Sequence, residues 1–476
     1  MTDLRRDDEV GELAREALGA IRRGAGDLGV LDQLLRRVLA GDEQTAVAST
    51  RALFAGLVEP LCDSFSQADR DAYVRVMARA IDACRAGARG VAIDAALTRL
   101  GLHAEDDLVA RVGRLRSAPP PGEADLADAA RIFVLSRVTL GADIAVTSVG
   151  LRRLAARFPR ARRVLCGGAK LAQLFGGDPR IELARLDYPR RGAFPERLAG
   201  WLDALAFFER ERFSGRDLLI DPDTRVGQLG LLPLVAREDR YYFFEGVPDG
   251  PDDRRSLGTH FGRWIDDRFG GPPRPEPADP FVALREEDRA LAESIFAATG
   301  LRDRRVVAVS LGVGGNERKR AGDAFEGNLI DGLLDSGCAV VLDQGGEKSE
   351  RGVAETAVER ARAAGRRVAA FADAAGARAL PGSDERPDLV TWNGGVGPFA
   401  ALIGGAAGYV GYDSLFQHVA AALGVPVVTV FLGYDHPVFP VRWRPSGPGP
   451  IRVFTFGSAE DVPDDLAGQV VRAATG

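Results

Sequence analysis

The pattern of apolar residues changes near residue 118, and this change limits the folds that the chain can adopt. Before that point apolar residues recur at helical spacing, as in residues 10–21. Beyond it, short apolar runs such as 132–135 and 306–310 alternate with longer amphipathic stretches. Runs that are apolar throughout are typical of parallel strands that helices cover on both faces. The sequence therefore predicts an α/β protein with an all-helical region in front of it.

Two segments rich in proline and glycine, residues 117–122 and 270–280, interrupt the chain. Its 476 residues are enough for about three domains. We expect an all-helical region over residues 1–118, a Rossmann-like domain over 128–270 and a second one over 281–476. Ligands of doubly wound sheets bind at the carboxyl ends of the strands. A cleft between the two Rossmann-like halves is thus the expected substrate site.

Composition argues against several classes of function. The net charge is −6 and no long basic run occurs, so binding to nucleic acid has little electrostatic support. The four cysteines are far apart and lack the spacing of a zinc site. The N-terminus does not follow the pattern of a signal peptide, and no apolar run approaches about 20 residues. We expect a cytoplasmic protein without an integral membrane segment.

Lysine is rare, since only Lys170, Lys319 and Lys348 occur among the 62 basic residues. Lys319 stands between two arginines, after the first predicted strand of the C-terminal half and shortly after the glycine-rich residues 312–315. Such a glycine cluster lets the backbone approach an anion closely. Lys319 is therefore a candidate phosphate ligand, and a solvated basic loop is the alternative.

The most informative segment is residues 411–433, in which a predicted strand ends near Gly411 and a helix rich in small residues follows. Asp413 and Ser414 occupy the cap position of that helix. Free backbone N–H groups and the positive end of the helix dipole can receive a diphosphate there. The alternative is that Asp413 only caps the helix and that His418 is a packed helical residue.

Residues 411–433, together with residues 436–445, resemble the donor-site signature of glycosyltransferase family 9, the heptosyltransferase family. Asp413, Ser414 and His418 match this signature in register. The resemblance implies a GT-B fold, in which two Rossmann-like domains face a cleft. It also implies an inverting, metal-independent transfer of a heptose-like sugar from a nucleoside diphosphate, with ADP-heptose favoured, to an acceptor hydroxyl. No cofactor is expected besides this nucleotide-sugar substrate.

The loop after the first strand of the first half, residues 137–143, resembles the Gly-Asp loop of the same family, with Ala142 as a one-residue insertion. The family's aspartate acts as general base toward the acceptor, so the resemblance makes Asp143 the candidate base. The alternative is a helix cap, and Asp223 is the second candidate base. Asp221 and Asp223 also spell an Asp-x-Asp metal pattern, but such triplets arise easily among 68 acidic residues, and we expect no metal there.

The resemblance assigns further donor contacts. Lys319 aligns with the family's phosphate-binding lysine, and Glu350 with the glutamate that binds the donor ribose, with Glu347 as the alternative. Leu415 departs from the family, which has glycine at that position. Trp443 has three possible places: over the nucleotide base, in the lining of the cleft, or in the core.

Residues 1–118 resemble no known family. We expect them to dock a partner or the acceptor or to form a homo-oligomer, and the alternative is a packing extension of the first half. The acceptor hydroxyl can belong to a glycan, a natural product or a protein. Two other functions stay open: another nucleotide-sugar enzyme such as an epimerase or dehydrogenase, and a non-catalytic binding or scaffold protein that keeps the fold. The first is disfavoured because no Gly-x-Gly-x-x-Gly follows the first strand.

Overall fold

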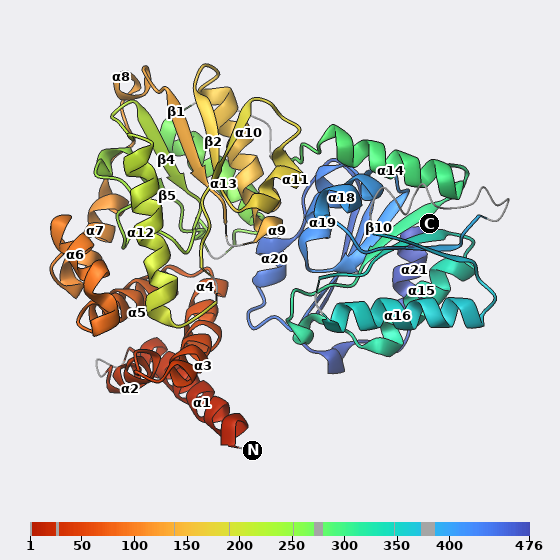
Figure 1. The fold of residues 1–476 in the computed structure, drawn as a ribbon, viewed down its shortest axis with the longest axis horizontal. Helices are drawn as coiled ribbons and strands as arrows, with labels where there is room; N and C mark the ends of the chain where they lie inside the picture. The colour runs from red at the N-terminus through yellow and green to blue at the C-terminus, as the bar shows by residue number, and fades with distance from the viewer. Residues whose placement is uncertain are drawn as a thin grey trace.

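The computed structural model describes residues 2–24, 28–137, 139–189, 191–250, 252–270, 279–346, 348–372 and 386–476. It contains two α/β halves side by side, with the N-terminal helices against the first half (Figure 1). The expected α/β class with two Rossmann-like domains is confirmed. The centre of the predicted linker, residues 271–278, lies outside the described residues.

The N-terminal region is helical, as its periodicity predicts. Its elements are α1 (Thr2–Arg22), α2 (Gly29–Val38), α3 (Glu43–Leu53), η1 (Phe54–Val58), α4 (Glu59–Asp63), α5 (Gln67–Arg85), η2 (Ala88–Gly90), α6 (Val91–Arg99) and α7 (Glu105–Ser117). Side chains mark where two of these helices begin. Asp42 accepts a hydrogen bond from the backbone N–H of Thr45 at the start of α3, and Ser66 does so from Asp69 at the start of α5.

The first half is built on a five-stranded parallel sheet in the order β3-β2-β1-β4-β5. Its strands are β1 (Arg131–Leu135), β2 (Arg162–Gly167), β3 (Ile181–Arg185), β4 (Asp217–Asp221) and β5 (Tyr241–Phe243). Its helical elements are α8 (Glu123–Leu126), α9 (Leu140–Ala142), η3 (Asp143–Thr147), α10 (Ser148–Arg157), η4 (Ala169–Leu171), α11 (Ala172–Phe175), α12 (Phe194–Arg210), η5 (Glu238–Arg240) and α13 (Leu257–Phe269).

The N-terminal helices cover one face of this sheet. Side chains alternate along β1, so Phe133 and Leu135 point to one face and Ile132 and Val134 to the other. The first pair shares a core with α5, α7 and α12, and the second with α10 and α13. The structure therefore confirms the alternative that the N-terminal region packs on the first half, at least for α5 and α7. Docking of a partner or acceptor and oligomerisation stay predictions.

The second half contains a seven-stranded parallel sheet in the order β12-β11-β10-β6-β7-β9-β8. Its strands are β6 (Val306–Ser310), β7 (Ala339–Asp343), β8 (Val368–Phe371), β9 (Leu389–Trp392), β10 (Gly408–Tyr412), β11 (Val427–Leu432) and β12 (Ile451–Phe456). Its helical elements are α14 (Glu286–Thr299), η6 (Leu301–Asp303), η7 (Glu317–Lys319), α15 (Asp323–Asp335), α16 (Lys348–Ala363), α18 (Val396–Gly404), α19 (Leu415–Ala422), α20 (Phe439–Trp443), η8 (Ala459–Asp461) and α21 (Leu466–Thr475).

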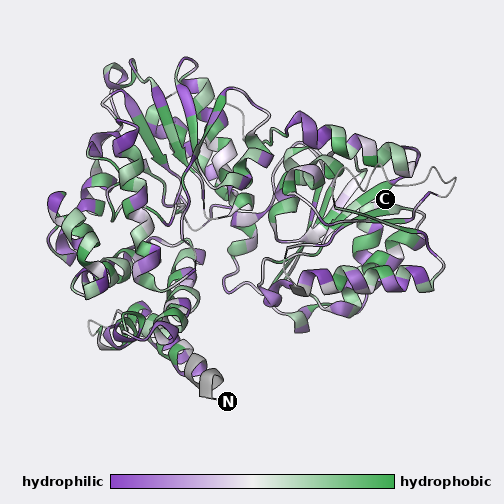
Figure 2. Ribbon diagram, viewed as in Figure 1, coloured by the Kyte–Doolittle hydropathy of each residue, from purple (hydrophilic) through white to green (hydrophobic). Residues whose placement is uncertain are grey.

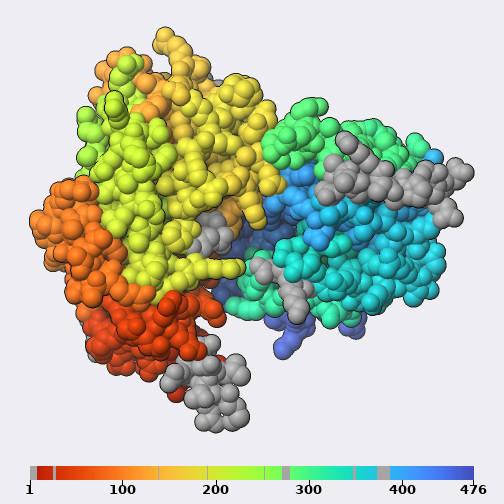
Figure 3. All heavy atoms as spheres, in the orientation of Figure 1, coloured from red at the N-terminus to blue at the C-terminus, as the bar shows by residue number. Residues whose placement is uncertain are grey.

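Apolar residues concentrate on the strands and on the sides of the helices that face them (Figure 2). This face of the molecule carries a notch between the N-terminal helices and the C-terminal half (Figure 3). Among the helices of the described residues, none combines the length and apolar character needed to cross a membrane.

Candidate active site

The two halves meet where the loop after β1 faces the helix after β10. The short helix α9 and the turn η3 contact α19, and Figure 1 shows α9, α19 and α20 at this junction. A Cβ atom added to Gly141 would lie 3.2 Å from Cα of Leu415 and 3.5 Å from Cδ2 of His418. The candidate base loop and the candidate donor helix are therefore in direct contact.

Asp143 is completely buried in the first of these segments. Its Oδ1 accepts hydrogen bonds from the backbone N–H of Arg137 (2.8 Å) and from Oγ1 of Thr147 (2.9 Å), and its Oδ2 accepts one from Oγ of Ser136 (2.7 Å). Burial raises the pKa of Asp143 to about 7, although these hydrogen bonds oppose the shift. A carboxyl with this pKa can take up and release a proton near neutral pH.

A π-helical turn follows Ala142. The turn η3 spans Asp143–Thr147, and the backbone N–H of Ser148 bonds to the carbonyl of Asp143 five residues earlier. A π turn holds one residue more than an α turn and is often found at functional sites. Asp143 begins this turn and accepts a hydrogen bond from the backbone N–H of Arg137.

Lys319 and Asp413 come together on the donor side, from segments 94 residues apart. Nζ of Lys319, at the end of η7, lies 2.5 Å from Oδ2 of Asp413 and 3.3 Å from its backbone carbonyl. Oδ1 of Asp413 accepts a hydrogen bond from Nε2 of Gln417 at 2.7 Å. The side chain of Lys319 keeps 22% of its surface exposed. The ammonium is therefore held at the start of α19 and stays open to a ligand.

Ser414 precedes α19 but its side chain does not cap the helix. Its Oγ is buried next to the buried hydroxyl of Tyr409 on β10, which interacts with the side chains of Ser414 and Ser310. The N–H groups at the start of a helix have no partner within the helix and favour an anionic ligand there. His418 is buried in the same helix, and burial lowers its pKa to about 4, so its imidazole is neutral at physiological pH.

Glu350 shapes the neighbouring loops. Its Oε1 accepts hydrogen bonds from the backbone N–H groups of Val313 (2.9 Å) and Gly314 (3.1 Å), and its Oε2 from that of Gly346 (2.8 Å). In this structure the carboxylate thus holds the glycine-rich loop after β6, and ribose binding by Glu350 stays a prediction. Glu347, its alternative, lies outside the described residues.

Asp343 is an acidic residue that the sequence reasoning did not identify. It ends β7, where burial raises its pKa to about 6 and Oγ of Ser310 lies 3.3 Å from its Oδ2. Its signal in the sequence was a carboxylate at the carboxyl end of a predicted parallel strand, the edge of the sheet where ligands bind.

The second candidate base, Asp223, is engaged by arginines. It has a left-handed φ of 63°, and its Oδ2 lies 3.3 Å from Nη2 of Arg137 and 3.5 Å from Nη2 of Arg70. Asp221 accepts hydrogen bonds from the backbone N–H of Thr224 and from the hydroxyl of Tyr241, both at 2.8 Å. Both acids of the Asp-x-Asp triplet therefore have protein partners. Arg70 lies on α5, so the N-terminal region reaches this edge of the sheet.

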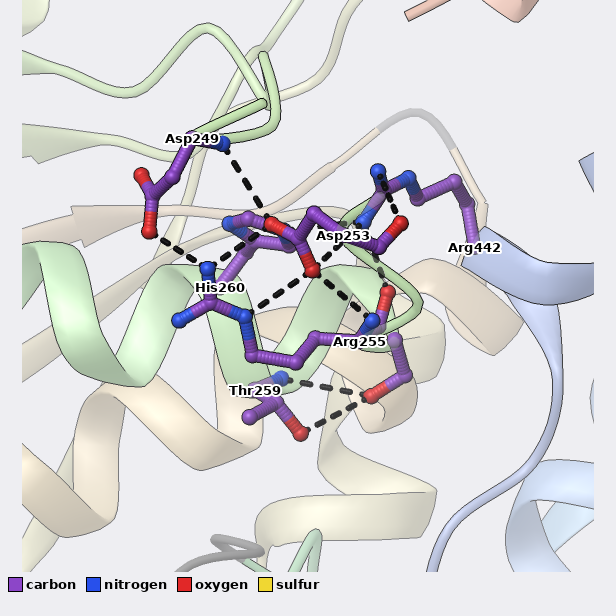
Figure 4. Close-up of polar contacts among 7 residues, drawn as sticks. Asp249, Asp253, Arg255, Thr259, His260 and Arg442 are labelled. Carbon is purple, nitrogen blue, oxygen red and sulfur yellow. Dashed lines mark hydrogen bonds and ion pairs between the residues drawn. The ribbon is translucent and has the colours of Figure 1, made fainter. Parts of the chain in front are cut away.

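Asp249, Asp253 and His260 form a separate cluster. Their potential metal-ligand atoms lie within 4.8 Å of one another. Cationic side chains fill the space between them (Figure 4). Nε of Arg255 lies 2.9 Å from Asp253, and Nη1 of Arg442 lies 3.5 Å from it. Although burial opposes it, Arg255 holds the pKa of Asp253 below its usual range. These residues form an ion-pair cluster, and its guanidinium groups take the positions that a cation would need.

Comparison with known proteins shows a local match to one family model and a similar fold. The model of glycosyltransferase family 9 (heptosyltransferase) matches residues 395–450, the segment that contains Asp413, Ser414 and His418. The chain is similar to the crystal structure of a family 9 glycosyl transferase from Veillonella parvula, with 17% identity and a TM-score of 0.53, over 73% of this chain and 96% of that one. No curated protein matches the sequence.

Two Escherichia coli structures are also similar. The ADP-heptose lps heptosyltransferase II has 18% identity and a TM-score of 0.49, over 72% of this chain and 97% of that one. Heptosyltransferase WaaC with ADP has 16% identity and a TM-score of 0.48, over 72% of this chain and 99% of that one.

Proposed function

We propose that this chain, which carries the donor-side segment of glycosyltransferase family 9 on the fold of a family 9 structure, is an inverting, metal-independent glycosyltransferase. It transfers a heptose-like sugar from a nucleoside diphosphate to an acceptor hydroxyl. ADP-heptose is the favoured donor because the matched family is that of the heptosyltransferases.

The observation that carries this proposal is the arrangement at the start of α19. Lys319 is held there by Asp413 with part of its side chain exposed, at the N-terminal end of the helix. The departing diphosphate gains negative charge as the sugar leaves, and prearranged cations and N–H groups stabilise such charge. These groups supply charge neutralisation without a metal ion. Asp221 and Asp223, the Asp-x-Asp pair, are bound by other side chains of the protein. This agrees with charge neutralisation by Lys319.

On the acceptor side, Asp143 takes the proton of the attacking hydroxyl. A sugar hydroxyl is a poor nucleophile, and a carboxylate in hydrogen-bond reach can accelerate its attack by about 10²–10⁴-fold. The hydroxyl attacks C1 from the face opposite the diphosphate, which inverts the configuration. Since Asp143 is fully buried, the loop after β1 must move away from α19 to admit the acceptor.

A non-catalytic binding protein is the second candidate. The backbone of Gly141 lies against the backbone of Leu415, and this contact leaves little space at the start of α19. A protein that binds a nucleotide sugar without transferring it would tolerate this contact.

A thermal-shift panel of ADP, UDP, GDP and their sugar nucleotides tests the donor. We expect stabilisation by the ADP series, and about 2.7 kcal/mol at a ligand concentration 100 times the Kd. The Lys319→Met variant should lose most of this shift, and Arg318→Met should keep it because Arg318 is exposed and paired with Asp435. No shift with any diphosphate would contradict the proposal. Binding without consumption of the donor, with any acceptor hydroxyl tried, would favour the second candidate.

A further inference from the structure

The short helix α20 touches three separate parts of the molecule. The ring of Phe439 lies 5.6 Å from Nζ of Lys319, on the donor side. The ring of Trp443 lies 5.5 Å from the guanidinium carbon of Arg137, on the acceptor side. Arg442, between them in sequence, enters a loop of the first half. Five residues therefore connect both sides of the candidate site.

Arg442 belongs to the second half, and its side chain is buried against a loop of the first half (Figure 4). Its Nη1 donates to the carbonyl of Arg255 (2.8 Å) and its Nη2 to that of Asp253 (3.0 Å). Nη1 also lies 2.8 Å from Nε2 of His260 and 3.5 Å from Oδ1 of Asp253. A planar guanidinium serves several acceptors in fixed directions, which a lysine cannot do.

The contacts of α20 continue to the residues that are proposed to react. Arg137, against Trp443, donates its backbone N–H to Asp143 at 2.8 Å and its Nη2 to Asp223 at 3.3 Å. Lys319, against Phe439, binds Asp413. A helix of five residues has little stability of its own, so tertiary contacts must determine its position. Among these contacts, those of Arg442 are polar and directional.

We propose that α20 aligns the donor and acceptor sides of the site and that Arg442 is the positioning residue that holds it. This inference rests on the proposed function, because the two sides are defined by the donor and the acceptor. Loss of the anchor leaves Lys319 and Asp413 in place, since both belong to the second half. It releases Trp443 from Arg137 and so loosens the loop that carries Asp143.

The test compares Arg442→Met, which keeps the length of the side chain and removes its donors, with Arg442→Lys, which keeps the charge. Arg153→Met is the matched control, because Arg153 is a buried arginine of the first half that pairs with Asp266 and not with α20. We expect Arg442→Met to lower kcat for sugar transfer about 10- to 100-fold, with KM for the donor nearly unchanged. Arg442→Lys should recover part of the rate, and Arg153→Met should lower kcat little.

Amide hydrogen exchange gives a readout that does not depend on turnover. In Arg442→Met we expect faster exchange in α20 and also over residues 139–147, where Arg153→Met leaves exchange unchanged. Faster exchange confined to α20 and to the loop around Asp253 would overturn the proposal, as would an equal loss of rate in Arg153→Met. If the wild-type protein consumes no donor, the proposed function fails, and the exchange pattern still decides whether Arg442 positions the loop.

Discussion

The loop after β1 and the loop after β10 have similar positions in their sheets, but their aspartates have different partners. Each follows a parallel strand at the same edge of its sheet, and each places an aspartate at the start of a helix, Asp143 in the first half and Asp413 in the second. Asp143 receives three hydrogen bonds from its own segment. Asp413 is paired with Lys319 from a distant loop.

This difference indicates which side of the junction between the halves is complete without a ligand. In the loop after β1, the carboxyl of Asp143 is buried, bonded within its own segment, and has a raised pKa. Beside the loop after β10, the partly exposed Lys319 lies at the N-terminal end of α19, where the first N–H groups of the helix can receive an anion. A ligand should therefore order the donor loop and displace the acceptor loop.

The largest expected effect is that of Asp143→Asn. If Asp143 is the base, this variant should lose about 10²–10⁴-fold in the rate of transfer, because an amide cannot take the proton. Its affinity for a nucleoside diphosphate, measured by calorimetry, should stay within about twofold, since the donor loop is unaffected. Thr147→Val, which keeps the carboxylate and removes one donor to it, is the control. An active Asp143→Asn beside an inactive Asp223→Asn would instead make Asp223 the base.

The raised pKa of Asp143 also predicts a dependence of stability on pH. The folded protein binds this proton more tightly than the unfolded chain, whose Asp has a pKa near 3.8. The stabilisation is therefore complete below pH 4 and is lost as pH rises to about 7. The free energy of unfolding of the wild type should fall relative to Asp143→Asn by about 1.4 kcal/mol per pH unit in this window. Urea denaturation of both proteins at pH 5, 6 and 7 measures it, and parallel curves would show that Asp143 titrates normally.

Lys319→Met should weaken binding of the diphosphate by about 1.5–3 kcal/mol, because a charge-assisted hydrogen bond is lost. Lys319→Arg should keep part of the affinity, since the charge remains. The exposed neighbour provides the control: Arg318→Met removes a cation that is engaged with Asp435 and should change the affinity little. Equal losses in the Lys319 and Arg318 variants would mean that only the overall positive charge of the loop matters.

The smallest effect concerns Leu415, which touches the acceptor loop at Gly141. Leu415→Gly restores the residue of the family and should bind a diphosphate a few-fold more tightly than Leu415→Ala, because the backbone at the helix start becomes more accessible. A glycine in a helix costs up to about 1 kcal/mol, so a small loss of thermal stability should accompany it. Weaker binding by Leu415→Gly than by Leu415→Ala would show that the leucine supports the site.

Much of the fold follows from local patterns. The apolar run 306–310 forms β6, and the run 132–135 lies within β1. The helical spacing of the first 118 residues predicts helices, which the structure contains. It does not predict that α5 and α7 cover the first sheet, because an apolar helix face does not specify which surface it meets.

The candidate site also contains residues that the sequence identified and residues that it did not. The resemblance to family 9 identified Lys319, Asp413 and Ser414, and the structure brings these three together. It did not identify Arg70, Arg137 or Arg442. These arginines are three among many in an arginine-rich chain, and their importance comes from partners more than 80 residues away in sequence.

The sequence by itself determined most of the strands, the two Rossmann-like halves and the resemblance of the donor-side segment, but it did not predict β3, β8 or β12. These properties depend on periodicity, on helix caps and on a short motif, all of which act between near neighbours. Only the tertiary structure decided that Asp143 is buried, that Lys319 pairs with Asp413 and that Arg442 crosses into the first half. Burial and charge pairing arise where distant segments pack together, and they set the pKa and the reach of each group.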